Sequence, residues 1–238
     1  MKNYNLLLMS LLLFSCSQES DIAGTTEVSN ALMTARLAVA KSPGNDLNPF
    51  DKAGSVYASL LDTYYQGQFN DTTVAQVYNR VRLLAATHTG FSELNGSPYT
   101  NDNVAGIIAI ISSPQASLQA IFSNGSLSFG ARASLSGFID NLILHKDDEF
   151  DVIYGFILGY ESMVMANGNF TTDEKRILLT TASIERFSAE YRKRRKDHDW
   201  ELLVGNVVAT LDGAVTDAPS AIITSLTVVI SNNSDAQY

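Results

Sequence analysis

Apolar residues recur at steps of three and four along most of this chain of 238 residues. The segment 52–66 shows the pattern clearly, because Val56, Leu60 and Tyr64 fall on one side of a helix with about 3.6 residues per turn. A half-buried β-strand would instead need strict alternation of apolar and polar residues. The spacing predicts a helix over 52–66 that stops at Gly67, and it restricts the chain to folds built from amphipathic helices.

Residues that start or stop helices predict further elements of the same kind. Ser113 is a suitable N-cap and Pro114 suits the first helical turn, so a short helix is expected from there to about residue 123. Thr171 and Glu174 form a capping box, which opens a long helix reaching about Arg194. Other helices are expected over 28–39, from Asp71 or Thr72 to about 90, over 135–142, from Asp147 or Asp148 to about 166, and after Asp197 or Asp199 over 203–211.

Three remaining segments complete the expected fold. The run 104–112 is apolar and short, and its periodicity does not decide between a helix and a short irregular or strand-like segment. The segment 220–230 is β-branched, but its helical neighbours and the lack of an obvious pairing strand favour a helix. The turn-forming residues of 91–103 predict a loop. The fold class predicted is therefore all-α, an irregular bundle of about seven to nine helices.

Charge and cysteine content limit what the domain does and how it is held together. The net charge is −9 at pH 7, which makes the chain a poor generic nucleic-acid binder, so no nucleic-acid partner is expected. The chain has a single cysteine, Cys16, so no intramolecular disulfide supports the fold. We expect one helical domain over 26–238, held by packing alone, after a leader 1–15 and a polar linker 16–25.

The first residues have the order of an export signal. Lys2 precedes an apolar run over 6–14 that is interrupted by Ser10. The run is shorter than the roughly 20 residues needed to cross a hydrocarbon core of about 30 Å. The order of charge and hydrophobicity therefore predicts a cleaved signal peptide over 1–15 and no stable transmembrane helix there.

Cys16 follows this run in the sequence Leu13-Phe14-Ser15-Cys16. These four residues resemble the lipobox of bacterial lipoproteins, with an aliphatic residue three positions before the cysteine and a small residue directly before it. The resemblance implies that the Cys16 thiol carries diacylglycerol and becomes an acylated N-terminus after cleavage. Two acyl chains suffice for stable anchoring, so the expected partner is a membrane. The alternative is a buried, inert cysteine in an apolar segment.

Three further segments resemble lipoproteins of the Bacteroidetes group. The polar residues Ser17 to Asp21 are similar to the acidic export signals of surface lipoproteins, although a solvated tether explains them equally well. The stretch "LNPFDKAGSVYASLLDTYY" and the stretch "TTDEKRILLTTASIERFSAEYRKRRK" are similar to uncharacterised lipoproteins of that group. The resemblance implies a location on the outer membrane, at its periplasmic or cell-surface face. It implies no activity, cofactor or catalytic residue.

The three histidines give no motif for metal binding or catalysis. His88 follows the apolar face of its helix and is expected to interact with the C-terminal end of that helix. His145 and His198 lie beside carboxylates, but those carboxylates stand where helix starts favour Asp. The sequence contains no HExxH motif, nucleophile elbow or phosphate loop. We therefore assign no catalytic residue, metal site or cofactor.

One run of basic residues stands apart from the acidic composition: Arg192, Lys193, Arg194, Arg195 and Lys196. At about 100° per residue, five consecutive side chains point to all sides of a helix and are expected to form an exposed collar. One interpretation is a cationic helix end that opposes the helix dipole. The other is a contact with anionic lipid head groups or lipopolysaccharide near the membrane anchor.

These observations favour a lipid-anchored, non-enzymatic binding or interaction module with an envelope protein or ligand as partner. A hydrolase with a dispersed site is one alternative, and it predicts that His145 or His198 meets carboxylates in a cleft. A membrane-active or bacteriocin-like protein is the other, and it predicts that the apolar segment 202–230 is exposed and separable from the rest. Asp212, Asp217 and Pro219 interrupt that segment, which favours two core helices joined by a turn.

Overall fold

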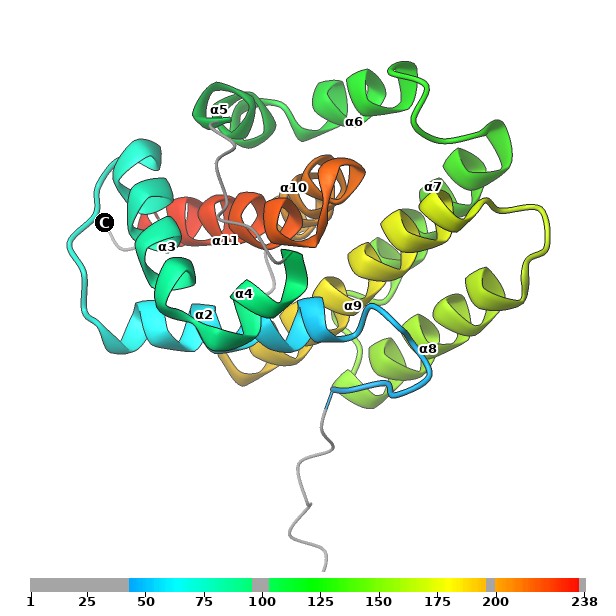
Figure 1. The fold of residues 1–238 in the computed structure, drawn as a ribbon, viewed down its shortest axis with the longest axis horizontal. Helices are drawn as coiled ribbons and strands as arrows, with labels where there is room; N and C mark the ends of the chain where they lie inside the picture. Colours follow the sequence, from blue (N-terminus) through cyan, green and yellow to red (C-terminus); the bar gives the residue numbers. More distant parts are fainter. Residues whose placement is uncertain (1–42, 96–102, 196–199, 236–238) are drawn as a thin grey trace, which may run out of the picture. The chain divides into compact units, whose positions relative to one another are not determined.

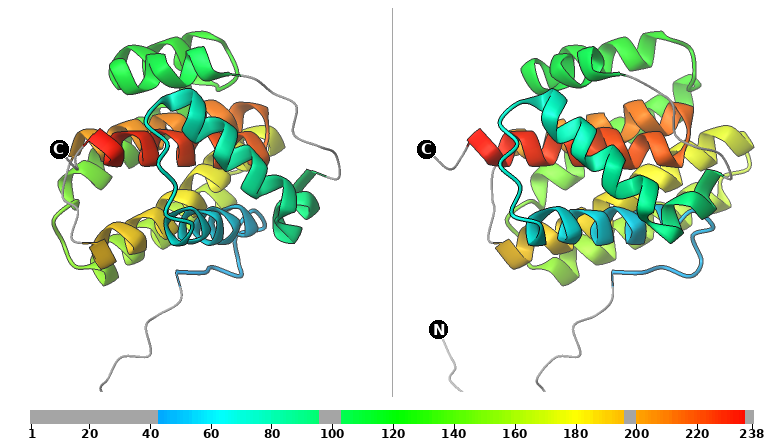
Figure 2. Two further views of the ribbon diagram at one scale, coloured as in Figure 1. Left: turned by 90° about the vertical axis from the view of Figure 1, so that its left-hand side faces the viewer. Right: turned by 60° about the vertical axis from the view of Figure 1, so that its left-hand side comes forward.

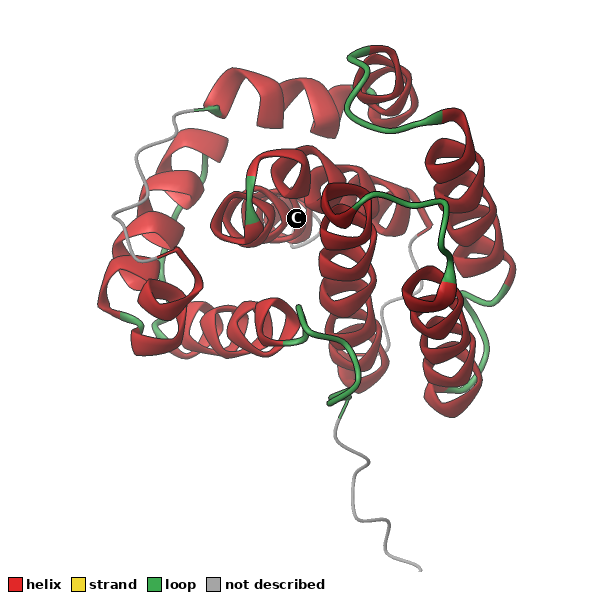
Figure 3. Cartoon of the chain, turned by 45° about the vertical axis from the view of Figure 1, so that its right-hand side comes forward, coloured by secondary structure: helices red, strands yellow, loops and turns green. Residues whose placement is uncertain are grey.

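Every regular element in the described part of the chain is an α-helix. The computed structural model describes residues 43–95, 103–195 and 200–235. Within these ranges lie ten helices: α2 (Lys52–Gln66), α3 (Val74–Thr87), α4 (Thr89–Asn95), α5 (Val104–Ser112), α6 (Pro114–Ser123), α7 (Phe129–Leu144), α8 (Phe150–Ala166), α9 (Thr172–Arg195), α10 (Trp200–Thr216) and α11 (Ala218–Asp235). The predicted all-α bundle is confirmed (Figures 1 and 3).

The number of helices exceeds the prediction because α4 and α5 lie in segments for which the sequence pattern does not predict a helix. Residues 104–112 form α5, and its Ile107 and Ile110 are buried one turn apart. The expected loop 91–103 begins inside the short helix α4. Residues 43–238 group into one unit, whereas the helix expected over 28–39 lies outside the described residues.

Helix α9 lies at the centre of this unit, between α2, α8 and α10 (Figures 1 and 3). From Ile177 to Ala189 its side chains are buried on every side. A helix enclosed in this way has no solvent face, which is why the polar residues in its middle must find partners inside the protein. Its start is the predicted capping box, with the Glu174 amide donating to Thr171 Oγ1 at 3.1 Å and the Thr171 amide donating to Glu174 Oε2 at 2.8 Å.

Helices α10 and α11 form a hairpin packed on α9 (Figures 1 and 2). At Gly213 a β-carbon would lie 2.4 Å from the Ala221 backbone, so only glycine allows the two helices to approach this closely. Val207, Leu211 and Ile222 are fully buried there. From Leu203 to Ile230 the apolar segment is therefore part of the core and not an exposed, separable element. None of the described helices combines the length and the hydropathy needed to span a membrane.

Two predicted helix starts are wrong by one to three residues. Helix α3 is capped by Thr73, whose Oγ1 accepts from the Gln76 amide at 3.3 Å, while Asp71 instead accepts from Tyr64 Oη at 3.2 Å. Helix α8 has Glu149 at its N-cap, because Asp148 is paired with His145 at 2.6 Å. In both places the aspartate that the local pattern predicts as the N-cap instead contacts another side chain.

A buried ionic network joins α9 to α8 and to the segment before α2. The Arg186 side chain is fully buried, and its Nη2 contacts the carboxylates of Asp51 and Glu161, the latter at 3.1 Å. Asn48 Nδ2 donates to Glu161 Oε1 at 2.8 Å, and Asn45 Nδ2 donates to Glu161 Oε2 at 2.6 Å. Every element that meets here therefore contributes a polar group to Arg186 or to Glu161.

The segment Asn48-Pro49-Phe50-Asp51 is held in position by this network. Asn48 Oδ1 accepts from the Phe50 amide at 2.9 Å, which forms the turn into α2, and Asn48 Nδ2 also donates to the Leu179 carbonyl of α9 at 3.0 Å. Ser183 of α9 donates to the Asp51 carbonyl at 3.0 Å and accepts from the Gly54 amide at 3.2 Å. These four residues therefore fasten the start of α2 to the central helix.

Removal of the Arg186 charge is expected to cost much more stability than removal of an exposed arginine. Arg186→Met would leave the buried Glu161 carboxylate and the partly buried Asp51 carboxylate without a counter-charge, which costs about 3–5 kcal/mol in the free energy of unfolding. Arg80→Met is the matched control, because the Arg80 side chain is 38% exposed and pairs with Asp71 at 3.3 Å. Its loss is expected to be below about 1 kcal/mol.

Urea unfolding of the two variants and of the parent protein measures this difference. A double variant, Arg186→Met with Glu161→Gln, tests its cause, because it removes one of the two uncompensated charges and should regain part of the lost stability. Equal losses in Arg186→Met and Arg80→Met would contradict the assignment of Arg186 as the charge that holds the network.

Candidate binding site

The residues singled out in the sequence do not come together in one site. Cys16 and Lys196 lie outside the described residues, and Lys193, Arg194 and Arg195 belong to the last turn of α9. Arg192 departs from the expected exposed collar. Its Nη1 donates to Ser188 Oγ at 3.2 Å and lies 3.9 Å from Glu185 Oε2, so this guanidinium is turned inward.

The two described histidines lie at different helix ends. His88 follows α3 as its C-cap, with Nδ1 accepting from the Phe91 amide at 3.2 Å and Nε2 lying 3.0 Å from Ser59 Oγ. His145 follows α7, its Nδ1 lies 2.6 Å from Asp148 Oδ2, and its ring contacts Phe156. His198 lies outside the described residues. Within the described ranges, no group of three or more His, Cys, Asp or Glu side chains could hold a metal ion.

A second buried polar cluster surrounds Glu185, the residue before Arg186. Glu185 Oε1 accepts from Asn206 Nδ2 at 2.8 Å and from Thr210 Oγ1 at 3.1 Å, both on α10. Ser225 of α11 donates to Asn206 Oδ1 at 2.5 Å. Burial raises the pKa of Glu185 to about 7, although Arg192 and these hydrogen bonds act in the opposite direction. Glu185 is thus a titratable group enclosed by the core.

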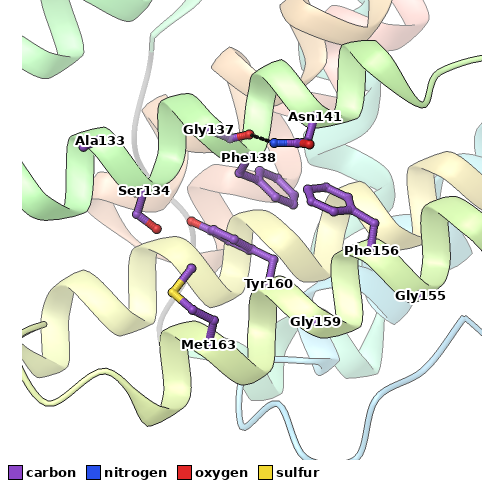
Figure 4. Close-up of a pocket in the computed structure, with 10 residues that line it drawn as sticks. All are labelled: Ala133, Ser134, Gly137, Phe138, Asn141, Gly155, Phe156, Gly159, Tyr160 and Met163. Atoms are coloured by element: carbon purple, nitrogen blue, oxygen red, sulfur yellow. Dashed lines mark hydrogen bonds between the residues drawn. The ribbon is translucent and has the colours of Figure 1, made fainter.

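A pocket of about 490 Å³ lies between α7 and α8 (Figure 4). Helix α8 rests on α9 through its buried face, which includes Ile157 and Glu161. The opposite side of α8 faces the pocket. The lining residues come from two helices: Ala133, Ser134, Gly137, Phe138 and Asn141 of α7, and Gly155, Phe156, Gly159, Tyr160 and Met163 of α8.

Stacked aromatic rings form the inner wall of this α7–α8 pocket. The Phe138 ring stacks on the Tyr160 ring with centroids 4.2 Å apart, and on the Phe156 ring with centroids 5.6 Å apart. Met163, which is 44% exposed, lies at the rim. Asn141 donates from Nδ2 to the Gly137 carbonyl at 2.7 Å. The lining contains no Asp, Glu, Lys, Arg or His, so its surface is apolar with a few neutral polar groups.

Three glycines line the pocket. A β-carbon at Gly137, Gly155 or Gly159 would meet no atom within 4 Å, and Gly155 and Gly159 are exposed. Glycine inside a helix is less stable than alanine by about 1 kcal/mol, and packing in the described part of the chain does not require it at these positions. The four-residue spacing of Gly155 and Gly159 is visible in the sequence and puts both on one helix face, but only the arrangement of α7 against α8 shows what that face encloses.

Two hydroxyl groups, Ser134 Oγ and Tyr160 Oη, lie behind the lining at one end of the pocket. Both are shielded from solvent, and Tyr160 as a whole is 7% exposed. Figure 4 shows the two hydroxyls turned toward each other. Burial raises the pKa of Tyr160, with a smaller opposing influence from Ser134, so the phenol stays neutral. Because neither hydroxyl oxygen is accessible to solvent, neither is accessible to a molecule in the pocket.

Comparisons of this chain with protein-family models, with curated proteins and with solved structures give no match. The α7–α8 pocket is therefore interpreted from its own geometry and chemistry.

The position of Glu185 makes the stability of the protein depend on pH. Because its folded-state pKa lies above the ordinary value of 4.5, the folded protein keeps a proton that the unfolded chain releases. This contribution is full below about pH 4.5 and is lost as the pH rises to about 7. Glu185→Gln should remove that loss and exceed the parent protein by about 3 kcal/mol above pH 7. The two α10 side chains that donate to Glu185, Asn206 and Thr210, are uncharged, and Arg192 is the cation that acts on it.

Urea unfolding between pH 4 and pH 8 measures this effect, with Glu174→Gln as the control. Hydrogen bonds from Ser128 and Thr171 lower the pKa of Glu174 to about 2. Its stabilising contribution is present above about pH 4.5 and is lost as the pH falls, so the control shifts the whole curve between pH 4.5 and pH 8 without changing its slope. If Glu185→Gln and the parent protein gave parallel curves, Glu185 would not be the group responsible.

Proposed function

We propose that this protein is a lipid-anchored, non-enzymatic binding protein of the cell envelope, and that the α7–α8 pocket is its binding site. The observation that carries the proposal is the pocket of about 490 Å³ between α7 and α8, whose lining combines stacked aromatic rings with helical glycines and contains no charged side chain. A bound molecule would remove this apolar lining from water, which favours binding. The hydroxyl groups in the lining have no basic side chain beside them to activate them as nucleophiles, which favours binding over catalysis.

The anchoring half of the proposal rests on Cys16 and its sequence context. A diacylated cysteine holds a protein on a membrane without a spanning helix. The outer membrane is the proposed location, with the helical unit on its periplasmic or cell-surface face. The run Arg192 to Lys196 is a weaker candidate for membrane contact, because Arg192 is engaged with Ser188 and Glu185 inside the protein.

The anchor is tested by Cys16→Ala, with Ser17→Ala as the matched control. We expect Cys16→Ala to abolish metabolic labelling with a radioactive fatty acid and to lose at least about tenfold of the protein from the membrane fraction, because no acyl chain remains. The control should keep both. Circular dichroism should show the same helix content and melting temperature in all three proteins. Retention of Cys16→Ala in the membrane fraction would refute the lipid anchor.

The binding half is tested by Gly159→Leu, which places a side chain in the open space of the pocket. Purified parent protein and variant are incubated with detergent extracts of the envelope, and the retained small molecules and proteins are compared by mass spectrometry. We expect a component that the parent protein retains and Gly159→Leu loses. Gly168→Ala is the control, since Gly168 also has open space around it but lies outside the pocket. Identical retention by all three proteins would refute the pocket as the binding site.

A further inference from the structure

We propose that the α7–α8 pocket receives a basic amphipathic helix of a partner protein. The apolar face of that helix lies along α7 and α8, and its lysine or arginine residues meet the acidic turn between them. This inference rests on the proposed function, because it assigns a kind of partner to the same site.

The apolar lining continues beyond the pocket along α8. At steps of three and four residues this helix carries Val152, Phe156, Gly159 and Met163, which places them along one face. Figure 4 shows Phe156 and Met163 extending from α8 toward α7. Val152 and Met163 are exposed. A helical stretch from Val152 to Met163 is roughly 16 Å long, so the open apolar face covers about three turns.

Helix α7 adds an exposed apolar side chain at the end where α8 begins. Leu144, in the last turn of α7, is 73% exposed and follows Asn141 of the pocket lining by three residues. Seven large apolar side chains are exposed in the described part of the chain, and three of them are Leu144, Val152 and Met163. Exposed apolar surface concentrated on one pair of helices indicates a site of interaction with another molecule.

The length and openness of this surface suit a helix. The pocket opens to solvent, since its lining includes the exposed residues Ala133, Asn141, Gly155 and Gly159. A partner helix with apolar residues at positions i, i+4 and i+7 would cover the full length of the surface, whereas a compact small molecule would leave one end in water. Gly155 and Gly159 have no side chain to hold the backbone of that helix away.

The turn that joins α7 to α8 determines the charge of the partner. Four of the five residues 147–151 are acidic, and all four are exposed. This turn lies beside the pocket, because the His145 ring lies 5.9 Å from the Phe156 ring of the lining. Asp140, directly before Asn141 of the lining, adds another exposed carboxylate. The pocket therefore has an apolar floor and an acidic end.

The basic residues of this region do not balance its carboxylates. The segment 129–166 contains two lysine or arginine residues, Arg132 and Lys146. Arg132 donates to the Phe122 carbonyl at 2.7 Å, and Lys146 pairs with Asp147 at 2.9 Å. Lysine or arginine residues at one end of the partner helix would complement the excess negative charge. The net charge of the chain, −9, adds attraction at longer range.

Three synthetic peptides of about 14 residues, or four helical turns, test the proposal on the purified full-length protein. The first is an amphipathic peptide of leucine and lysine. The second has the same leucine positions with glutamate in place of lysine, and the third has the composition of the first in an order that forms no apolar face. Binding is measured at pH 7 by fluorescence anisotropy. We expect micromolar binding of the first peptide, weakened several-fold by added salt, and at least about tenfold weaker binding of the other two.

A first pair of double variants tests the apolar surface. Val152→Ser with Met163→Ser should weaken the leucine–lysine peptide by about tenfold, because two apolar contacts are lost. Leu83→Ser with Ile108→Ser is the matched control, since both residues are exposed but lie on α3 and α5. The control should bind like the parent protein. Because all four side chains are exposed, circular dichroism should show unchanged helix content in both variants.

A second pair tests the charge. Asp140→Asn with Asp151→Asn should weaken the leucine–lysine peptide by about fivefold and reduce the effect of salt, because two carboxylates near the pocket are removed. Asp46→Asn with Glu93→Gln changes the net charge equally at exposed residues outside α7 and α8. This control should change the affinity by less than about twofold.

The partner class is overturned if the leucine–lysine peptide does not bind, if the leucine–glutamate peptide binds as well, or if either double variant on α7 and α8 has no greater effect than its control. It is also overturned if the protein forms dimers that Val152→Ser with Met163→Ser abolishes, because a second copy would then occupy the surface. The proposed function is judged separately. Capture of an envelope component that Gly159→Leu loses would uphold the pocket as a binding site even if that component were a small molecule.

Discussion

The Arg186 guanidinium is fully enclosed by protein, and the arrangement of α2, α8 and α9 depends on its pairing with Asp51 and Glu161. Apolar stripes alone allow helices to pack in several registers, because leucine and valine contacts are not directional. A buried cation is different, since any register that separates it from its carboxylates leaves a charge without a partner. We therefore attribute to this network the selection of one packing among those that the apolar pattern allows.

Glu185, the residue before Arg186, connects α9 to α10. Consecutive residues of a helix point about 100° apart, so Glu185 and Arg186 face different neighbours. Arg186 meets Glu161 of α8, whereas Glu185 meets Asn206 and Thr210 of α10. Each side of α9 therefore carries a directional polar contact inside an otherwise apolar core. For both contacts to be buried, α9 must be covered on all sides. Helices α2, α8 and α10 cover it (Figure 3).

Local chemistry in the sequence predicted where many helices begin and end, because those signals act within a few residues. Gly67 stops α2, Pro114 opens α6, and Thr171 with Glu174 opens α9. The wrong starts of α3 and α8 have a tertiary or neighbouring contact as their cause, as the pairing of Asp71 with Tyr64 shows. Periodicity also could not show that the charged middle of α9 is buried. The candidate site was hidden for the same reason, since its walls come from two helices that no motif connects.

The two faces of α8 link the ionic network to the pocket. Glu161 ties one face to Arg186, Asn45 and Asn48, while Gly155 and Gly159 leave the opposite face open. Helical glycines loosen a helix, so α8 needs support from its other face to keep the pocket wall in place. The buried carboxylate provides that support at Glu161, two residues beyond Gly159 and directly after Tyr160, whose hydroxyl lies at the end of the pocket. A pocket wall that is fixed on one face by a buried ion pair and is open on the other face is preorganised, because the wall gains little order when a ligand binds.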